Sequence, residues 1–225
     1  MDGSLPFQLF GFVSLGISMA LFGWRLRKFN LLTRPLDRAT PKGSVPKGVI
    51  YAFSLGMAPW AKESTRRHWA AYLRGVAFHL GIFLGLAIFV VSSWLLSLPF
   101  AWRFGLALAC GAGAILGVIG FLLRFVDHNL RMLSQPDDYF AVAIVSLFLA
   151  VTALWLIVPS TLPFYYLASG SLFIYAPFSK IRHCIYFAYS RLFFGKWIGS
   201  RAVLPHAQSL KGKGNTCATP SASMR

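Results

Sequence analysis

Residues 75–96 read GVAFHLGIFLGLAIFVVSSWLL, and this stretch decides the class of fold. It contains no Asp, Glu, Lys or Arg, and a helix of about 20 such residues crosses a hydrocarbon core about 30 Å thick. The stretch therefore predicts a membrane-spanning helix. An ionisable side chain inside such a helix costs free energy, so His79 is a candidate functional residue.

The composition of the whole chain agrees with a membrane protein. Of the 225 residues, 56% are apolar and only 12% are charged, against about 25% charged residues in a typical soluble domain. Apolar stretches long enough to span a bilayer take up most of the chain and leave no room for a sizeable soluble domain. We therefore expect an all-α integral membrane protein.

Four further apolar stretches complete a predicted five-transmembrane-helix bundle. The predicted helices cover residues 5–24, 75–96, 104–125, 139–158 and 164–190. The first stretch lacks the basic start and the small-residue cleavage site of a signal peptide, so we expect it to be retained as a helix. Residues 1–200 are predicted to form a single membrane domain, followed by a flexible cytoplasmic tail over residues 201–225.

The basic residues predict the orientation of this bundle, because Lys and Arg beside spans are retained on the cytoplasmic side. With the N-terminus outside and the C-terminus inside, 21 of the 22 Lys and Arg fall on the cytoplasmic side, and only Arg103 lies outside. The basic loop 25–74 is then cytoplasmic. Its mixed segment 44–60 predicts an interfacial helix that lies on the membrane.

The net charge of +16 does not indicate a nucleic-acid-binding protein, because the charges lie at the ends of spans. No zinc-ligand spacing, Gly-rich phosphate loop or nucleic-acid-binding module accompanies them. Anionic membrane lipids and an acidic cytoplasmic protein are the expected partners. The three cysteines, Cys110, Cys184 and Cys217, lack the spacing of an iron–sulfur site or a disulfide framework.

A second histidine, His183, lies at a predicted depth that matches His79. His79 is about five residues, roughly 7 Å, beyond Arg74 on the cytoplasmic half of its helix. His183 is about eight residues, roughly 12 Å, before Arg191 on the same half of the fifth helix. The two depths agree within the usual error of helix boundaries. A bis-histidine site for the iron of a b-type haem is the simplest structure that requires both residues.

Charged and small residues beside the histidines fit the same interpretation. Haem propionates are anionic, and Arg74, Lys180 and Arg182 are placed to pair with them. Gly75 lies one turn before His79 on the same helix face and leaves room for a flat macrocycle. Two alternatives stay open: the histidines form hydrogen bonds between helices, and the cations serve only as topology determinants.

Other histidines and glycines near these spans are weaker candidates for the site. His68 returns to nearly the same helix face as His79, about 16 Å away, but it follows two arginines at the membrane surface. His128 lies in a polar loop between two spans. Gly81 and Gly85 are four residues apart and face away from His79, so they predict a helix-packing contact.

Two motifs carry a resemblance to a known family. FHLGIFLGLAIF at residues 78–89 and YAPFSKIRH at residues 175–183 resemble the cytochrome b gamma subunit of respiratory nitrate reductase, a likeness that covers the second to fifth predicted helices. Residues 59–83 are more similar to the small membrane subunit of the high-molecular-weight cytochrome c complex of sulfate reducers, and to membrane subunits of the sulfite-reduction-associated complex. The resemblance implies a multi-pass protein of a prokaryotic inner membrane.

The resemblance also implies a number of haems. In that family two haems are held across the membrane, each by one histidine of the second helix and one of the fifth. His79 and His183 match the ligands of the haem nearer the cytoplasm. The positions that match the other pair hold Phe89 and Tyr165, which are not expected to replace histidine ligands. One haem b is therefore expected.

The function implied by the family is electron transfer between a membrane quinone and a cytoplasmic iron–sulfur subunit, beside other membrane and periplasmic cytochrome subunits. Such a chain is not catalytic alone, and the missing outer haem leaves the position of a quinone site open. A haem-free membrane anchor for a peripheral redox enzyme and a small transporter are the alternatives. The transporter is disfavoured because all six Asp and Glu lie in predicted loops or termini, and no internal repeat is visible.

Overall fold

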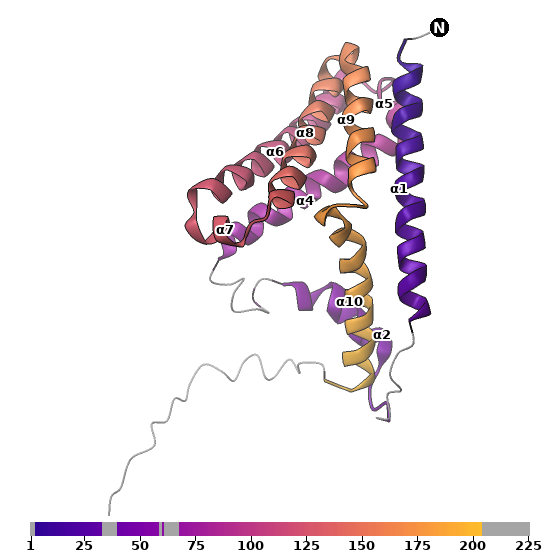
Figure 1. The fold of residues 1–225 in the computed structure, drawn as a ribbon, viewed down its shortest axis with the longest axis vertical. Helices are drawn as coiled ribbons and strands as arrows, with labels where there is room; N and C mark the ends of the chain where they lie inside the picture. Colours follow the sequence, from indigo (N-terminus) through magenta and orange to yellow (C-terminus); the bar gives the residue numbers. More distant parts are fainter. Residues whose placement is uncertain (1–2, 33–39, 59, 61–67, 204–225) are drawn as a thin grey trace, which may run out of the picture. The chain divides into compact units, whose positions relative to one another are not determined.

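The computed structural model describes residues 3–32, 40–58, 60 and 68–203, and its regular elements are all helical (Figure 1). The α-helices are α1 (Leu5–Leu31), α2 (Val45–Phe53), α4 (Trp69–Val90), α5 (Ser92–Leu95), α6 (Phe100–Val126), α7 (His128–Leu133), α8 (Pro136–Ile157), α9 (Leu162–Tyr175) and α10 (His183–Ser200). Short 3₁₀ turns are η1 (Leu55–Met57), η3 (Pro159–Thr161) and η4 (Lys180–Arg182). The predicted all-α class is confirmed.

Four of these helices are long and apolar enough to cross a membrane: α1, α4, α6 and α8. They correspond to the first four predicted spans, so the multi-pass membrane character is confirmed. α1 continues beyond the predicted end at residue 24 to Leu31, because Arg and Lys are good helix formers. α8 begins earlier than predicted, at Pro136, so Asp137 and Asp138 lie in its first turn and not in a loop.

The prediction of one continuous fifth helix over residues 164–190 is wrong. α9 ends at Tyr175 after 14 residues, and α10 begins only at His183. Pro177 lies in the interruption and is fully buried. Proline has no amide hydrogen and its ring clashes with the preceding helical turn, so an α-helix does not run through it unbroken. At about 1.5 Å per residue, α9 alone is shorter than a hydrocarbon core of about 30 Å.

The chain divides into two compact units, which are described separately. Unit 1 comprises Met1–Arg34 and Lys62–Tyr186, and unit 2 comprises Pro35–Ala61 and Phe187–Arg225. The predicted tail over residues 201–225 lies outside the described residues from 204 onward. In unit 1, α6 packs against α4 and α8, while α9 packs against α1 and α8.

Glycines allow the helices of unit 1 to approach closely. A Cβ added at Gly81 would lie 3.1 Å from the Cα of Gly113 on α6, so these two backbones are in contact. At Gly85, an added Cβ would lie 2.8 Å from the ring of Phe148 on α8. The predicted packing role of Gly81 and Gly85 is confirmed.

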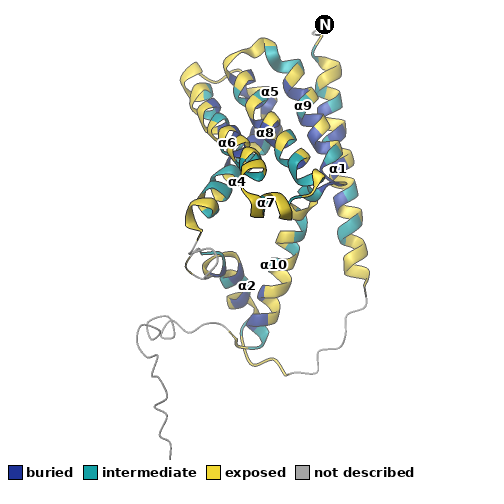
Figure 2. Ribbon diagram, turned by 60° about the vertical axis from the view of Figure 1, so that its left-hand side comes forward, coloured by how far each residue is buried: buried dark blue, intermediate teal, exposed yellow. Residues whose placement is uncertain are grey.

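The two ends of unit 1 differ in packing density. We call them the α5 end and the α7 end after the short helices that lie there (Figure 1). The buried residues of α4 begin at Gly81, and none lies among its residues 69–80. The buried residues of α6 likewise end at Gly117, before the α7 end (Figure 2). The bundle is therefore closely packed at the α5 end and open at the α7 end.

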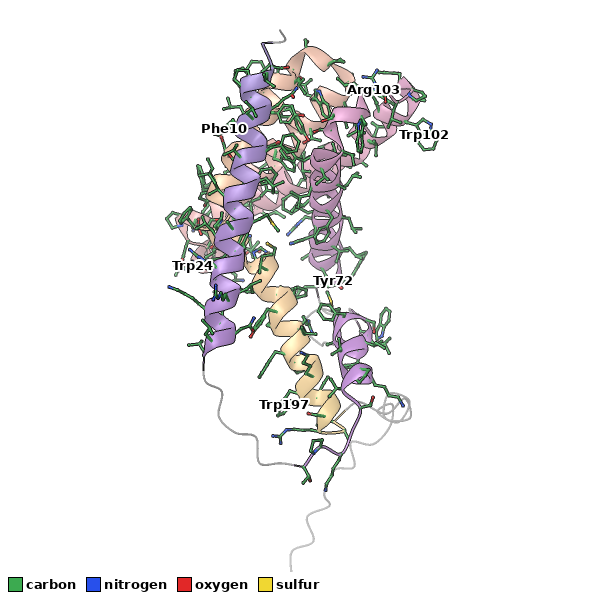
Figure 3. All side chains as sticks on the ribbon, turned by 90° about the vertical axis from the view of Figure 1, so that its right-hand side faces the viewer. Phe10, Trp24, Tyr72, Trp102, Arg103 and Trp197 are labelled. Carbon is green, nitrogen blue, oxygen red and sulfur yellow. The ribbon has the colours of Figure 1, made fainter. Side chains whose placement is uncertain are left out.

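Exposed tryptophans mark both ends of the same unit. Trp94 of α5 is 75% exposed and Trp69, the first residue of α4, is 62% exposed. Trp102, at the α5 end, is 70% exposed, and Trp24, towards the other end, is 53% exposed (Figure 3). Tryptophan is enriched where a membrane meets water, since its ring is apolar and its N–H is polar. The exposed apolar side chains between these two belts suit a lipid environment.

Unit 2 is built on a close contact between α2 and the later part of α10. A Cβ at Gly48 would overlap the backbone of Gly195 and Gly199, so only glycine fits at this crossing. The amides of Lys42 and Gly43 both donate hydrogen bonds to the Ser200 carbonyl, at 2.8 and 3.1 Å. α2 lies within the predicted interfacial segment 44–60, whose position on the membrane surface stays a prediction.

Candidate metal centre

His79 and His183 face each other at the α7 end of unit 1. Their ring centroids are 6.2 Å apart, and the ring planes are inclined by 77°. α4 supplies His79 from its middle, and His183 is the first residue of α10. Both residues are exposed, in the half of the bundle where α4 has no buried residue. The structure thus brings together the two histidines that the sequence singled out.

Within the described residues, the hydrogen bonds of the two imidazoles involve Nδ1 of each ring and leave Nε2 without a partner. Nδ1 of His79 donates to the Gly75 carbonyl at 2.7 Å, and Nδ1 of His183 donates to the Lys180 carbonyl at 2.6 Å. A carbonyl oxygen only accepts, so each neutral ring carries its proton on Nδ1 and its lone pair on Nε2. Metal-ligating histidines typically show this arrangement, in which one nitrogen binds the metal and the other donates to a fixed oxygen.

The separation of the rings suits two ligands on opposite sides of one metal ion. A metal–nitrogen bond is about 2 Å long, and an imidazole centroid lies about 1 Å behind its nitrogen, so two opposed ligands have centroids about 6 Å apart. The observed 6.2 Å agrees with this value. The two neutral rings do not hydrogen-bond to each other. Each has its one N–H on Nδ1, which donates to a backbone carbonyl, so neither Nε2 has a hydrogen to donate.

The helix surface beside His79 is open at Gly75. A Cβ added at Gly75 would meet no atom within 4 Å, and the clearance for a haem at this position stays a prediction. The ring of Phe78 lies 6.0 Å from that of His79 and packs against Gly117 of α6. The histidine therefore has both a packed aromatic ring and an open position as neighbours on its own helix.

The three cations predicted beside the site differ in their contacts. Lys180 Nζ forms a salt bridge with Asp138 Oδ2 at 2.6 Å, so its charge is already paired. Arg182 is exposed on η4, and within the described residues its guanidinium has neither an ion pair nor a hydrogen bond, although its backbone amide donates to the Ser179 carbonyl. Arg74 extends towards Gly120 of α6. Arg74 and Arg182 are thus better placed than Lys180 to receive an anionic group.

The weaker histidine candidates lie elsewhere in unit 1. His68 is exposed at the start of α4, eleven residues and about 16 Å of helix away from His79. His128 is the exposed first residue of α7, where its Nδ1 lies 3.5 Å from the Arg131 guanidinium. Neither histidine is paired with a second imidazole in the part of the chain that the structure describes.

The positions that match an outer haem are filled by packed aromatic rings. Phe89 and Tyr165 are fully buried, and their centroids lie 6.1 Å apart. Tyr165 also stacks on Trp155 at 4.4 Å, and Phe89 contacts Phe173 edge to face at 4.8 Å. This aromatic cluster occupies the α5 end.

Two carboxylates near His183 were not recognised from the sequence. Asp137 accepts hydrogen bonds from the Tyr175 hydroxyl and the Lys180 amide, and Asp138 holds the Lys180 ammonium. The sequence did offer one signal: two of the six Asp and Glu in the chain are adjacent to each other. Lys180 lies 43 residues after Asp137 and 42 after Asp138, so only the fold reveals these contacts.

A shallow pocket of 270 Å³ also lies at the basic end of α1. It is lined by Arg25, Lys28, Phe29, Leu32 and Tyr186. Two cations beside aromatic and aliphatic side chains suit the head group and upper chain of an anionic lipid. The pocket contains neither of the facing histidines.

Within the described residues, no three His, Cys, Asp or Glu side chains gather as a metal site. Searches of protein-family models, curated proteins and solved structures find no match to this chain.

Proposed function

We propose that this chain is a b-type cytochrome subunit of a respiratory membrane complex. His79 and His183 are the axial ligands of one haem b near the cytoplasmic side. The complex passes electrons between the membrane quinone pool and a cytoplasmic iron–sulfur subunit. The observation that carries the proposal is the facing pair of imidazoles, 6.2 Å apart, with both Nε2 atoms free of hydrogen bonds within the described residues.

Each part of the chain has a defined task in this proposal. A bound haem supplies a one-electron carrier whose potential depends on its axial ligands, burial and nearby charge. His79 and His183 supply the ligands, and the carbonyls of Gly75 and Lys180 hold their tautomers. Arg74 and Arg182 supply positive charge for the propionates.

The membrane arrangement proposed with this function has five crossings, the N-terminus outside and the C-terminus inside. α9, the interruption at residues 176–182 and the first residues of α10 together form the fifth crossing. Irregular backbone at membrane depth is tolerated where protein groups satisfy its polar atoms. Asp137 does so here, because it accepts from both Tyr175 and Lys180 across the interruption.

The proposed partners supply the redox groups for which this chain has no binding motif. Its cysteines do not have the spacing of an iron–sulfur site, so another subunit has to supply the clusters. Other membrane and periplasmic cytochrome subunits complete the complex, by resemblance to the sulfate-reducer relatives. The basic pocket at the end of α1 and the other span-end cations interact with anionic lipid of an inner membrane.

A haem determination on the purified full chain tests the proposal. The pyridine haemochrome assay should give about one haem b per chain, and the reduced-minus-oxidised spectrum should be that of a b-type cytochrome. His79→Ala and His183→Ala should each abolish most of the haem content. His128→Ala is the matched control, because this histidine is exposed on α7 and should leave the content unchanged.

Two results would contradict the ligand assignment: a purified wild-type protein without haem, or haem retained after both histidines are replaced. The first result would favour the haem-free anchor, whose cytoplasmic basic residues dock a peripheral redox enzyme. A ratio near two haems per chain would show that His68 or His128 also serves as a ligand.

A further inference from the structure

The chain turns sharply just before His183. Ser179 is buried at the start of this turn, and its Oγ accepts a hydrogen bond from the Ile181 amide at 3.2 Å. η4 then leads directly into His183, the first residue of α10. The imidazole is therefore oriented from a short irregular turn, which needs support from elsewhere in the fold.

Two neighbouring carboxylates of α8 provide this support. Asp137 accepts a hydrogen bond from the Lys180 amide at 2.8 Å and another from the Tyr175 hydroxyl. It therefore joins the last residue of α9 to the first residue of η4. Asp138 Oδ2 pairs with Lys180 Nζ at 2.6 Å and also accepts from the Gln135 amide at 2.8 Å.

Lys180 connects the carboxylates to the imidazole. Its amide is held by Asp137, while its carbonyl accepts the Nδ1–H of His183 at 2.6 Å. Residue 180 is thus fixed on both sides. Hydrogen bonds to an ionised carboxylate are stronger than those between neutral groups, so Asp137 holds the Lys180 amide more strongly than a neutral acceptor would.

His79 is oriented in a different way. Its Nδ1–H donates to Gly75, four residues earlier in the same helix. This bond depends on α4 alone, whereas the bond of His183 depends on a turn that α8 holds in place. A change at the start of α8 should therefore alter one imidazole and leave the other as it is.

We propose that Asp137 and Asp138 are positioning residues for His183. Asp137 fixes the backbone whose carbonyl orients the imidazole. Asp138 neutralises and anchors the Lys180 side chain, so that the positive charge near the site with no ion pair among the described residues comes from Arg74 and Arg182. The effect on a haem rests on the proposed function, but the hold of Asp137 on the turn does not require a haem.

Hydrogen–deuterium exchange of the full chain in detergent tests the hold on the turn. In Asp137→Ala, amides of residues 178–186 should exchange about tenfold faster, because a charge-assisted hydrogen bond across the interruption is lost. Asp137→Asn should exchange more slowly than the alanine variant, since an amide oxygen still accepts. Asp127→Ala is the control: Asp127 caps α7 through the amides of Asn129 and Leu130, and should leave this segment unchanged.

Electron paramagnetic resonance of the ferric protein tests the consequence for the site. The g values of a bis-imidazole haem depend on the angle between the two ring planes, so they should shift in Asp137→Ala and stay unchanged in Asp127→Ala. Tyr175→Phe removes one donor to Asp137 and keeps the ring that packs on Phe140. It gives a smaller shift, and it replaces the alanine variant if that variant does not fold.

The two readouts separate this proposal from the proposed function. If the haem-loaded protein keeps the same exchange rates and g values after every substitution of Asp137, the positioning role is overturned and the proposed function is left intact. A haem-free wild type would contradict the function. In that case, faster exchange in Asp137→Ala still supports the hold on the turn, and unchanged exchange overturns it.

Discussion

The imidazoles of His79 and His183 lie 6.2 Å apart in the open half of unit 1, whereas Phe89 and Tyr165 lie 6.1 Å apart in its packed half. The two pairs have nearly the same spacing but opposite surroundings. Both histidines are exposed, and both aromatic residues are fully buried. This contrast supports one ligand-binding position at the α7 end and a packed interior at the other.

Free imidazole should restore the site after removal of one ligand. His183→Gly leaves a ring-sized space beside the Lys180 carbonyl, so added imidazole can bind there and take the place of the side chain. We expect the amplitude of the haem bands in the reduced-minus-oxidised spectrum to fall below about a tenth of the wild-type amplitude and to recover with millimolar imidazole. No recovery in a folded variant, or an undiminished spectrum without imidazole, would contradict the assignment.

A large side chain at residue 75 should block the site without disturbing the fold. An added Cβ at Gly75 meets no atom within 4 Å, and the same is true of Gly105 on α6, which serves as the matched control. Gly75→Phe should lower haem content several-fold at an unchanged melting temperature, because its ring enters the space beside His79. Gly105→Phe should lower neither quantity. Equal haem loss in both variants would contradict the proposal that residue 75 adjoins the haem site.

The three cations should differ in their effect on the reduction potential. An electron added to the site is stabilised by nearby positive charge, so Arg74→Gln and Arg182→Gln should each lower the midpoint potential by tens of millivolts, on the order expected for partly screened charges. Lys180→Gln should have a smaller effect, since Asp138 already neutralises that ammonium. Redox titration of the three variants measures this, and a larger shift for Lys180 than for either arginine would refute it.

Close packing at the α5 half should make Gly85 intolerant of even one methyl group. A Cβ there would lie 2.8 Å from Phe148 and 2.9 Å from Leu149, both of which are fully buried among other side chains. Gly85→Ala should destabilise the protein by about 1–3 kcal/mol. Gly105→Ala should not, because its position is open. Thermal unfolding in detergent compares the two, and equal melting temperatures would argue against the close contact.

The proposed orientation can be checked by labelling single cysteines in intact cells. Asn129 of α7 and Ser160 of η3 are exposed at opposite ends of α8. With native cysteines replaced, Ser160→Cys should react with a membrane-impermeant maleimide from outside, and Asn129→Cys only after the cells are opened. The reverse pattern would invert the topology. Labelling of both positions from outside would mean that α8 does not cross the membrane.

Hydropathy and charge predicted the first four spans to within a few residues at most ends, because lipid requires long apolar helices whatever their neighbours are. The fifth span shows where that reasoning stops. Residues 164–190 have the composition of one helix, yet the chain leaves the α-helix near Pro177. The polar backbone freed there is held by Asp137, which no local pattern connects to Tyr175 and Lys180.

The charges beside the site show the same limit. Sequence position alone treats Lys180 and Arg182 as equivalent cations. The fold pairs Lys180 with Asp138, 42 residues earlier in the chain, and leaves Arg182 exposed. Contacts between residues so distant in sequence depend on how α8 and the turn before α10 pack, and a single sequence does not report this.

The sequence by itself determined the helical membrane class, the four long spans and the two histidines of interest, since the cost of polar groups in lipid limits what an apolar stretch can be. Only the tertiary structure decided that the two rings lie 6.2 Å apart, that the fifth stretch breaks before His183, and that Asp137 and Asp138 contact Lys180 at that break. Those features depend on hydrogen bonds and packing between separate helices, which form only once the bundle has assembled.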